Sequence, residues 1–323
     1  METKLLPSLS AAMKATGLRD GMTISFHHHL RNGDYVLNLV LEEAARMGIR
    51  DLTVNASSLF DIHMPIVGHI RNGVVTRLLT DYVSGGIGRY ISEGILPTPV
   101  EFRSHGTRAT DIASGRTPID IAFVAAPAAD CRGNCTGKLG HAACGSLGYA
   151  IPDATYAKQV VVLTDTLLPY PLPDWSISEN LVDYVVQVEA IGDPKGILSG
   201  TTRITRDPVG LVMADTAAKV IQASGLLQDG FSFQTGAGGA SLAAAASLKE
   251  IMLREQIHGS FALGGITGYL VEMLRAGCFR QLMDVQCFDL DAVASIRDDP
   301  RHREISANHY AGPGTRGAVV YSL

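Results

Sequence analysis

Three consecutive histidines, His27, His28 and His29, stand between a short apolar run and a segment with helical periodicity. Imidazole rings can donate hydrogen bonds to a carboxylate, coordinate a metal ion, or order a turn. If the strand continues through them, His27 and His29 share one face and His28 takes the other. Adjacent histidines rarely converge on one ion. The pattern therefore favours contacts to an acidic substrate, with a structural turn and a metal site as the alternatives.

A second loop, QTGAGGAS, places three glycines between a strand-like run and a helix. Without side chains the backbone can come close to a ligand, and consecutive N–H groups at a helix N-terminus favour an anion or a developing oxyanion. The alternative is a turn that only lets the helix pack on the strand. The loop lacks the spacing of a dinucleotide fingerprint and has no Walker lysine. The glycines concerned are Gly236, Gly238 and Gly239.

Two further loops carry arginines that could present a guanidinium group to a carboxylate. The segment SHGTRAT sets His105 and Arg108 just after a predicted strand, and GGIGRYISEG sets Arg89 behind glycines. A surface ion pair is the alternative for either arginine.

The segment CRGNCTGKLGHAAC raises the question of zinc, because thiolates and an imidazole can complete a tetrahedral site. Its spacing matches no standard zinc motif, and it has the glycine-rich character of a loop beside a buried strand. We therefore predict half-buried loop residues and no metal site. The residues concerned are Cys131, Cys135, His141 and Cys144.

The elements that must position these loops occur twice in the chain. GLRDGMTISFHHHLRNGDYVLNLVL, from Gly17, matches GLLQDGFSFQTGAGGASLAAAASL, from Gly225, in having a turn, a short strand, a loop and a helix. A second strand follows each helix, and then comes a helix that ends on glycine and leads to a third strand. The corresponding positions there are Arg71 and Gly73 in the first segment, and Arg275 and Gly277 in the second.

Strands that alternate with helices at this spacing predict an α/β fold with two similar, open, mostly parallel sheet halves covered on both faces. Further strands are expected from Val100 and Ile119, and the stretch from Pro169 to about Asp215 is expected to connect the halves. Ligands bind at the carboxyl ends of such strands. The histidine loop and the glycine loop are therefore predicted to face each other across one cleft.

The length of 323 residues also favours two halves, which we place at residues 1–215 and 216–323. The last run, GAVVYSL, is strand-like and stops at Leu323, so we expect the second half to be incomplete. A net charge of -5 argues against a nucleic-acid partner. The chain has no apolar window long enough to span a membrane and begins without the features of a secretory signal. A cytoplasmic location is expected.

Long strings in the chain resemble the family of citrate lyase α subunits, which are citrate CoA-transferases. The resemblance spans nearly the whole chain and rests on these segments: DGMTISFHHHLRNGDYV, NGVVTR, SHGTR, CGSLGYA, VDYVVQVEAIGDPKGI, TTRITRDP, DGFSFQTGAGGASLA, SFALGGITG and ISANHYAGPG. It implies two CoA-transferase-type halves. It also implies an exchange in which an acetyl thioester on an acyl carrier subunit and citrate give a citryl thioester and acetate. Members of the family continue well past Leu323.

The resemblance implies partners and roles as well. The partners are a β subunit, which cleaves the citryl group, and a γ acyl carrier subunit, which carries a phosphoribosyl-dephospho-CoA thioester; no cofactor is bound covalently to this chain. We expect the three glycines to stabilise the oxyanion, and His28, His29, His105 and Arg108 to bind citrate carboxylates. Gly264 and Gly265 are expected to allow close approach of the pantetheine arm. A non-catalytic subunit of the same fold that binds a small acid or serves assembly is the alternative.

Overall fold

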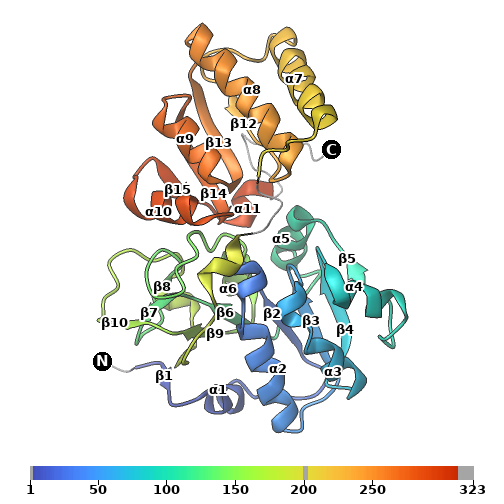
Figure 1. Ribbon diagram of the computed structural model, residues 1–323. Coiled ribbons are helices and arrows are strands. Elements are labelled where there is room, and N and C mark those ends of the chain that lie inside the picture. Colours follow the sequence, from blue (N-terminus) through green and yellow to red (C-terminus); the bar gives the residue numbers. More distant parts are fainter. Residues whose placement is uncertain (1–2, 199–202, 312–323) are drawn as a thin grey trace.

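The computed structural model describes residues 3–198 and 203–311, and strands alternate with helices throughout them (Figure 1). The larger sheet has eight strands in the order β1-β11-β9-β6-β2-β3-β4-β5, and every neighbouring pair is parallel. Its strands are β1 (Leu5–Leu6), β2 (Thr23–Phe26), β3 (Leu52–Ala56), β4 (Val75–Thr80), β5 (Glu101–Phe102), β6 (Ile121–Ala125), β9 (Gln159–Thr164) and β11 (Tyr184–Gln187).

Helices cover this sheet on both faces, which is why the central strand β6 is buried along its whole length. Helix α2 shows how a helix buries one stripe: Val36, Leu37, Val40, Leu41 and Ala44 are buried at the spacing of one helical face. The helices of this unit are α1 (Leu9–Ala15), α2 (Val36–Arg46), α3 (Ile66–Arg71), α4 (Gly85–Ser92), α5 (His105–Ala113) and α6 (Ala150–Tyr156).

Short elements complete the first unit. A small sheet has the order β10-β7-β8, and its β7 and β8 strands pair antiparallel. These strands are β7 (Ala128–Asp130), β8 (Cys135–Thr136) and β10 (Leu167–Leu168). The short 3-10 helices are η1 (Arg31–Gly33), η2 (Asp61–His63), η3 (Glu179–Leu181) and η4 (Pro194–Ile197).

The second sheet has four parallel strands among the described residues, in the order β12-β13-β14-β15. They are β12 (Ser232–Phe233), β13 (Gly259–Ile266), β14 (Phe279–Cys287) and β15 (His302–Glu304). The helices of this unit are α7 (Pro208–Ala223), α8 (Gly239–Glu255), α9 (Gly268–Arg275), α10 (Leu290–Asp298) and α11 (Ala307–Ala311). Helix α7 packs along α8. The predicted division between residues 215 and 216 lies within α7.

The predicted order of elements holds in both repeated segments. The first runs β2-α2-β3-α3-β4 and the second runs β12-α8-β13-α9-β14. Gly73 and Gly277 follow α3 and α9 with φ of 70° and 80°, a left-handed conformation that glycine adopts without a steric cost. The mostly parallel α/β fold is thus confirmed.

The stretch from Pro169 to Asp215 also contributes to the first unit, because β11 within it pairs with β1 and β9 inside the larger sheet. The strand expected from Val100 is present as the two residues of β5 at the sheet edge. The final predicted strand, GAVVYSL, lies outside the described residues.

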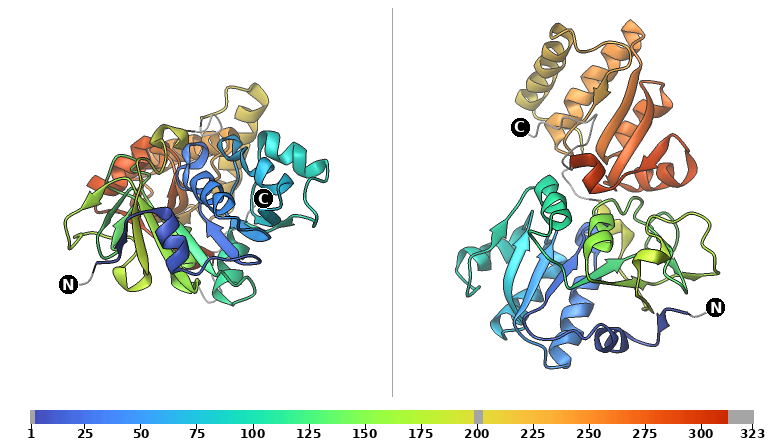
Figure 2. Two further views of the ribbon diagram at one scale, coloured as in Figure 1. Left: turned by 90° about the horizontal axis from the view of Figure 1, so that it is seen from below. Right: turned by 180° about the vertical axis from the view of Figure 1, so that it is seen from behind.

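The two sheets meet at the carboxyl ends of their strands, with α11 at the junction (Figures 1 and 2). Buried hydrogen bonds join them there. The Gln286 side chain in β14 donates to the His28 carbonyl at 2.9 Å, and the Ser146 hydroxyl donates to the Asp284 carbonyl at 2.8 Å. The two loops predicted to face each other thus belong to strand ends that converge on one region.

Candidate functional site

The histidine loop follows β2 directly and is buried. The backbone N–H of Ala125 donates to His27 Nε2 at 2.9 Å, and His27 Nδ1 contacts His29 Nδ1. The Tyr149 N–H in turn donates to His29 Nε2 at 3.2 Å, so both rings are tied to the backbone. Burial lowers the pKa of His27 to about 4 and also lowers the pKa of His29. Both rings are neutral and brace the loop, which is the structural-turn alternative. We had predicted that His29 binds a citrate carboxylate, but its side chain is buried and faces His27.

His28 points the other way and lies among side chains of the junction. Its Nδ1 is 2.6 Å from the Ser57 hydroxyl, and its ring centroid is 5.3 Å from that of His105 and 5.2 Å from that of Tyr149. Burial lowers the pKa of His28 well below its usual value, so this ring is also neutral. It can exchange a hydrogen bond with a ligand but cannot supply positive charge.

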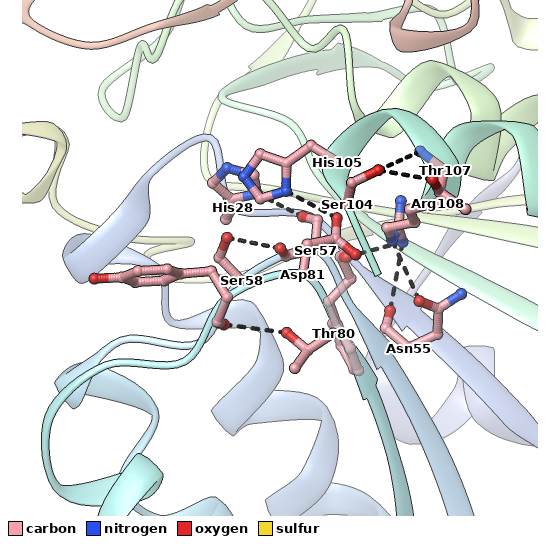
Figure 3. A network of polar contacts seen from close by, with 12 residues as sticks. His28, Asn55, Ser57, Ser58, Thr80, Asp81, Ser104, His105, Thr107 and Arg108 are labelled. Atoms are coloured by element: carbon pink, nitrogen blue, oxygen red, sulfur yellow. Dashed lines mark hydrogen bonds and ion pairs between the residues drawn. The ribbon is translucent and has the colours of Figure 1, made fainter. Parts of the chain in front are cut away.

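His105 is the more accessible imidazole of this group and begins helix α5 (Figure 3). Its side chain is 38% exposed, whereas the Asp81 side chain, whose Oδ2 lies 3.0 Å from His105 Nδ1, is 1% exposed. Burial raises the pKa of Asp81, and its Oδ1 has no hydrogen-bond partner among the described residues. Because Nδ1 is used by Asp81, Nε2 is the nitrogen that His105 can offer to a ligand. The structure brings the predicted residues His28 and His105 together.

Arg108 is buried and its guanidinium is fully engaged (Figure 3). It forms a bidentate pair with Asp153 at 2.8 and 2.7 Å, and its Nε donates to the Asn55 side chain at 3.2 Å. A weaker bond reaches the carbonyl of Phe26 at the end of β2. Arg108 therefore ties the carboxyl ends of β2 and β3 to α6, and its donors are not free for the citrate carboxylate that we had predicted. Arg89 is exposed and pairs with Glu93 at 2.9 Å, which is the surface ion pair given as its alternative.

The glycine loop joins β12 to α8, and Gly238 is the N-cap residue of that helix. Gly236 and Gly238 are exposed, and a Cβ at Gly238 would meet nothing within 4 Å. Gly239 is packed instead: its carbonyl accepts from the Thr205 N–H at 3.1 Å, and a Cβ there would lie 2.8 Å from the Arg203 carbonyl oxygen. Gly236 and Gly238 are open to a ligand, whereas Gly239 serves packing.

Gly264 and Gly265 lie near the end of β13, at an irregularity of its pairing with β14. A Cβ on Gly264 would lie 3.5 Å from the Tyr310 ring of α11, so this glycine faces the junction. A Cβ on Gly265 would overlap the ring of Phe288. The Phe288 ring thus makes a close approach to Gly265 within the protein.

The segment from Cys131 to Cys144 buries two of its three thiols. Cys135 and Cys144 are buried, and burial raises the pKa of both thiols, which disfavours the thiolate that zinc requires. Within residues 3–198 and 203–311, no group of three or more histidine, cysteine or acidic side chains is arranged to hold an ion.

Several junction residues were not predicted from the sequence. Asp81 directly follows β4, so the rule that placed the other loops at strand ends could have found it. Phe288 directly follows β14 and Arg31 lies in the loop after β2, so the same rule could have reached them. Tyr149 and Tyr310 gave no such signal, because only the packing of the two sheets brings them to the junction.

Two parallel sheets whose strand ends meet at a polar junction define an α/β protein built from two sheet-bearing units. Its fold is similar to that of a 4-hydroxybutyrate CoA-transferase from Porphyromonas gingivalis, which matches with a TM-score of 0.58 at 13% identity, over 95% of this chain and 68% of that one. The family model of the citrate lyase alpha subunit, CitF, matches residues 2–323. The chain belongs to that family.

Its relatives include the citrate lyase alpha chain of Haemophilus influenzae, which is 49% identical over 322 residues. That alignment covers 100% of this chain and 64% of the relative, so this chain spans less than two thirds of its length. The Streptococcus mutans protein described as an alpha subunit of citrate lyase in complex with citrate has a TM-score of 0.94 at 50% identity, covering 98% of this chain and 62% of that one. In the part of this chain that the structure describes, none of the helices is both long and apolar enough to cross a bilayer.

Proposed function

We propose that this chain is the citrate CoA-transferase component of a citrate lyase. A carboxylate of citrate attacks the carbonyl carbon of an acetyl thioester and displaces the carrier thiolate, which leaves a mixed anhydride of citrate and acetate. The thiolate then attacks the citryl carbonyl of the anhydride and expels acetate. The products are a citryl thioester and acetate. The observation that carries this proposal is the junction of strand-end loops in a member of the citrate lyase alpha family.

The junction offers groups suited to this exchange. His105 Nε2 can donate to a carboxylate while Asp81 fixes the ring, and the exposed N–H groups around Gly236 and Gly238 can accept the developing oxyanion. Glu304 is a half-buried carboxylate of the junction and accepts hydrogen bonds from the Leu147 N–H and the Ser146 hydroxyl. A carboxylate held in this way is poorly placed to form a glutamyl thioester.

The wider assignments belong to the same proposal. The two sheet-bearing units are two CoA-transferase-type halves, and the repeated succession of strands and helices supports this. The thioester is that of a phosphoribosyl-dephospho-CoA group on a γ acyl carrier subunit, and a β subunit cleaves the citryl product. An incomplete second half stays a prediction.

Incubation of the protein with citrate and acetyl-CoA, or with the acetylated carrier subunit, tests the reaction. Mass spectrometry should detect a citryl thioester and one equivalent of acetate. Citrate binding without any citryl thioester would contradict the transferase proposal and support the alternative of a small-acid-binding or assembly subunit.

A further inference from the structure

Arg31 holds a positive charge at the junction without a counter-ion. Its Nε and Nη1 atoms are buried and have no hydrogen-bond partner, and no ion pair involves its guanidinium in the described part of the chain. Arg108 in the same unit shows the contrast, because its guanidinium is satisfied by Asp153. A buried cation that lacks an acceptor costs folding free energy, so its retention calls for a ligand that pairs with it.

Aromatic rings from both units hold the Arg31 guanidinium in place. Its central carbon lies 4.9 Å from the ring centroid of Phe288, which follows β14, and 5.7 Å from that of Phe60, which precedes η2. Phe288 in turn rests on Gly265, where any side chain would displace it. Cation–π contacts orient a guanidinium but leave its N–H donors unused. Burial lowers the pKa of Arg31, as expected for a cation that no carboxylate compensates.

The backbone of Arg31 is also unusual and firmly held. Its φ of 52° lies in the left-handed region that residues with a side chain seldom adopt. Its N–H donates to the His28 carbonyl at 3.0 Å, and Gly33 packs so closely on η4 that a Cβ would overlap the Asp193 carbonyl. Strained conformations of this kind persist where the surrounding structure fixes a functional group.

We propose that Arg31 binds a carboxylate of the polycarboxylate substrate at the junction. The inference rests on the proposed function. It assigns the positive charge that binds citrate to Arg31 and not to Arg108. The three histidines of the loop are neutral, and Arg108 is engaged by Asp153, so neither can balance the charge of citrate. Arg31 is close enough to His28 to lower its pKa, and the His28 ring contacts that of His105. Arg31 and the His105 imidazole thus lie on either side of His28, where one anion with several carboxylates would contact both.

Replacement of Arg31 by methionine tests the assignment through citrate binding rather than turnover. Isothermal titration calorimetry on the full chain should show citrate affinity at least about tenfold weaker in Arg31→Met, the cost of a lost charge-assisted hydrogen bond. The melting temperature without citrate should be unchanged or higher, because an uncompensated cation is removed. Arg89→Met, which removes an equal charge from the surface, should bind citrate like the wild type. Acetate, with one carboxylate, should lose much less affinity than citrate in Arg31→Met.

The outcomes separate this inference from the proposed function. Unaltered citrate affinity in folded Arg31→Met overturns the role of Arg31 and leaves the transferase proposal standing. Failure of the wild type itself to bind citrate contradicts the proposed function. Arg31→Gln, which keeps a polar side chain without the charge, repeats the measurement if the methionine variant folds poorly. An equal loss of affinity in Arg89→Met would also overturn the inference, since it would mark a nonspecific effect of net charge.

Discussion

Gln286 is the next-to-last residue of β14, and its side chain donates a buried hydrogen bond of 2.9 Å to the carbonyl of His28. The two residues are 258 positions apart in the chain. The second sheet thereby fixes the loop that the first sheet presents at its strand ends. Because His28 also contacts the ring of His105, the arrangement of the candidate site depends on how the two units dock.

Loss of this bond should destabilise the protein. In Gln286→Ala the His28 carbonyl is left buried with one partner fewer, and we expect unfolding free energy to fall by about 1–3 kcal/mol. Gln187→Ala, at an exposed position of β11, should change it by less than about 0.5 kcal/mol. Urea unfolding of both variants measures the difference. Equal stability of the two variants would show that the bond does not couple the units.

The role assigned to Arg108 predicts a large structural effect. Arg108→Met leaves the Asp153 carboxylate buried without its cation, which should cost about 3–5 kcal/mol of unfolding free energy. The double variant Arg108→Met with Asp153→Leu should be more stable than the single variant, because no uncompensated charge remains. Denaturant titration checks both. If the single variant is as stable as the wild type, the ion pair with Asp153 is not structural, and Arg108 is free to bind substrate.

The buried histidines predict a loss of stability in mild acid. Burial lowers the pKa of His27 from 6.5 to about 4, so between these values the unfolded chain binds a proton that the folded chain does not. Stability therefore rises with pH across this window and is lost as pH falls through it. His27→Gln should flatten the slope of unfolding free energy against pH by up to about 1.4 kcal/mol per unit. An unchanged slope would mean that His27 is protonated in the folded protein.

Gly265 in β13 and Gly238 in the glycine loop should respond differently to substitution. A Cβ on Gly265 overlaps the Phe288 ring, so Gly265→Ala should lower unfolding free energy by about 1–3 kcal/mol. A Cβ on Gly238 meets nothing within 4 Å, so Gly238→Val should keep the circular dichroism spectrum of the wild type while citryl thioester formation falls. Full turnover in a folded Gly238→Val protein would contradict the oxyanion role of that loop.

Much of the fold could be predicted from local patterns in the sequence. The two runs of strand, helix, strand, helix and strand could be predicted because each has apolar periodicity and a glycine where the second helix ends, as at Gly73 and Gly277. The carboxyl ends of parallel strands share one edge, so the sequence could place the loops of one sheet together. His28 and His105, which follow different strands, do lie together.

Roles that depend on distant packing could not be predicted. The sequence neighbours of Arg108 do not reveal that Asp153 occupies its guanidinium, and those of Gly265 do not reveal the Phe288 ring. Arg31 was overlooked although it stands only two residues after His29, because its positive φ and its aromatic neighbours exist only in the folded protein. The sequence thus indicated where the site lies better than it indicated which side chains are free to act.

Hydrogen–deuterium exchange of the chain with and without citrate tests most directly whether the junction is the binding site. Peptides that contain the histidine loop, residues 27–34, and the end of β13, residues 264–268, should both exchange more slowly when citrate is present. Protection that is absent from both peptides while citrate binds, or that is confined to residues far from the junction, would contradict the account.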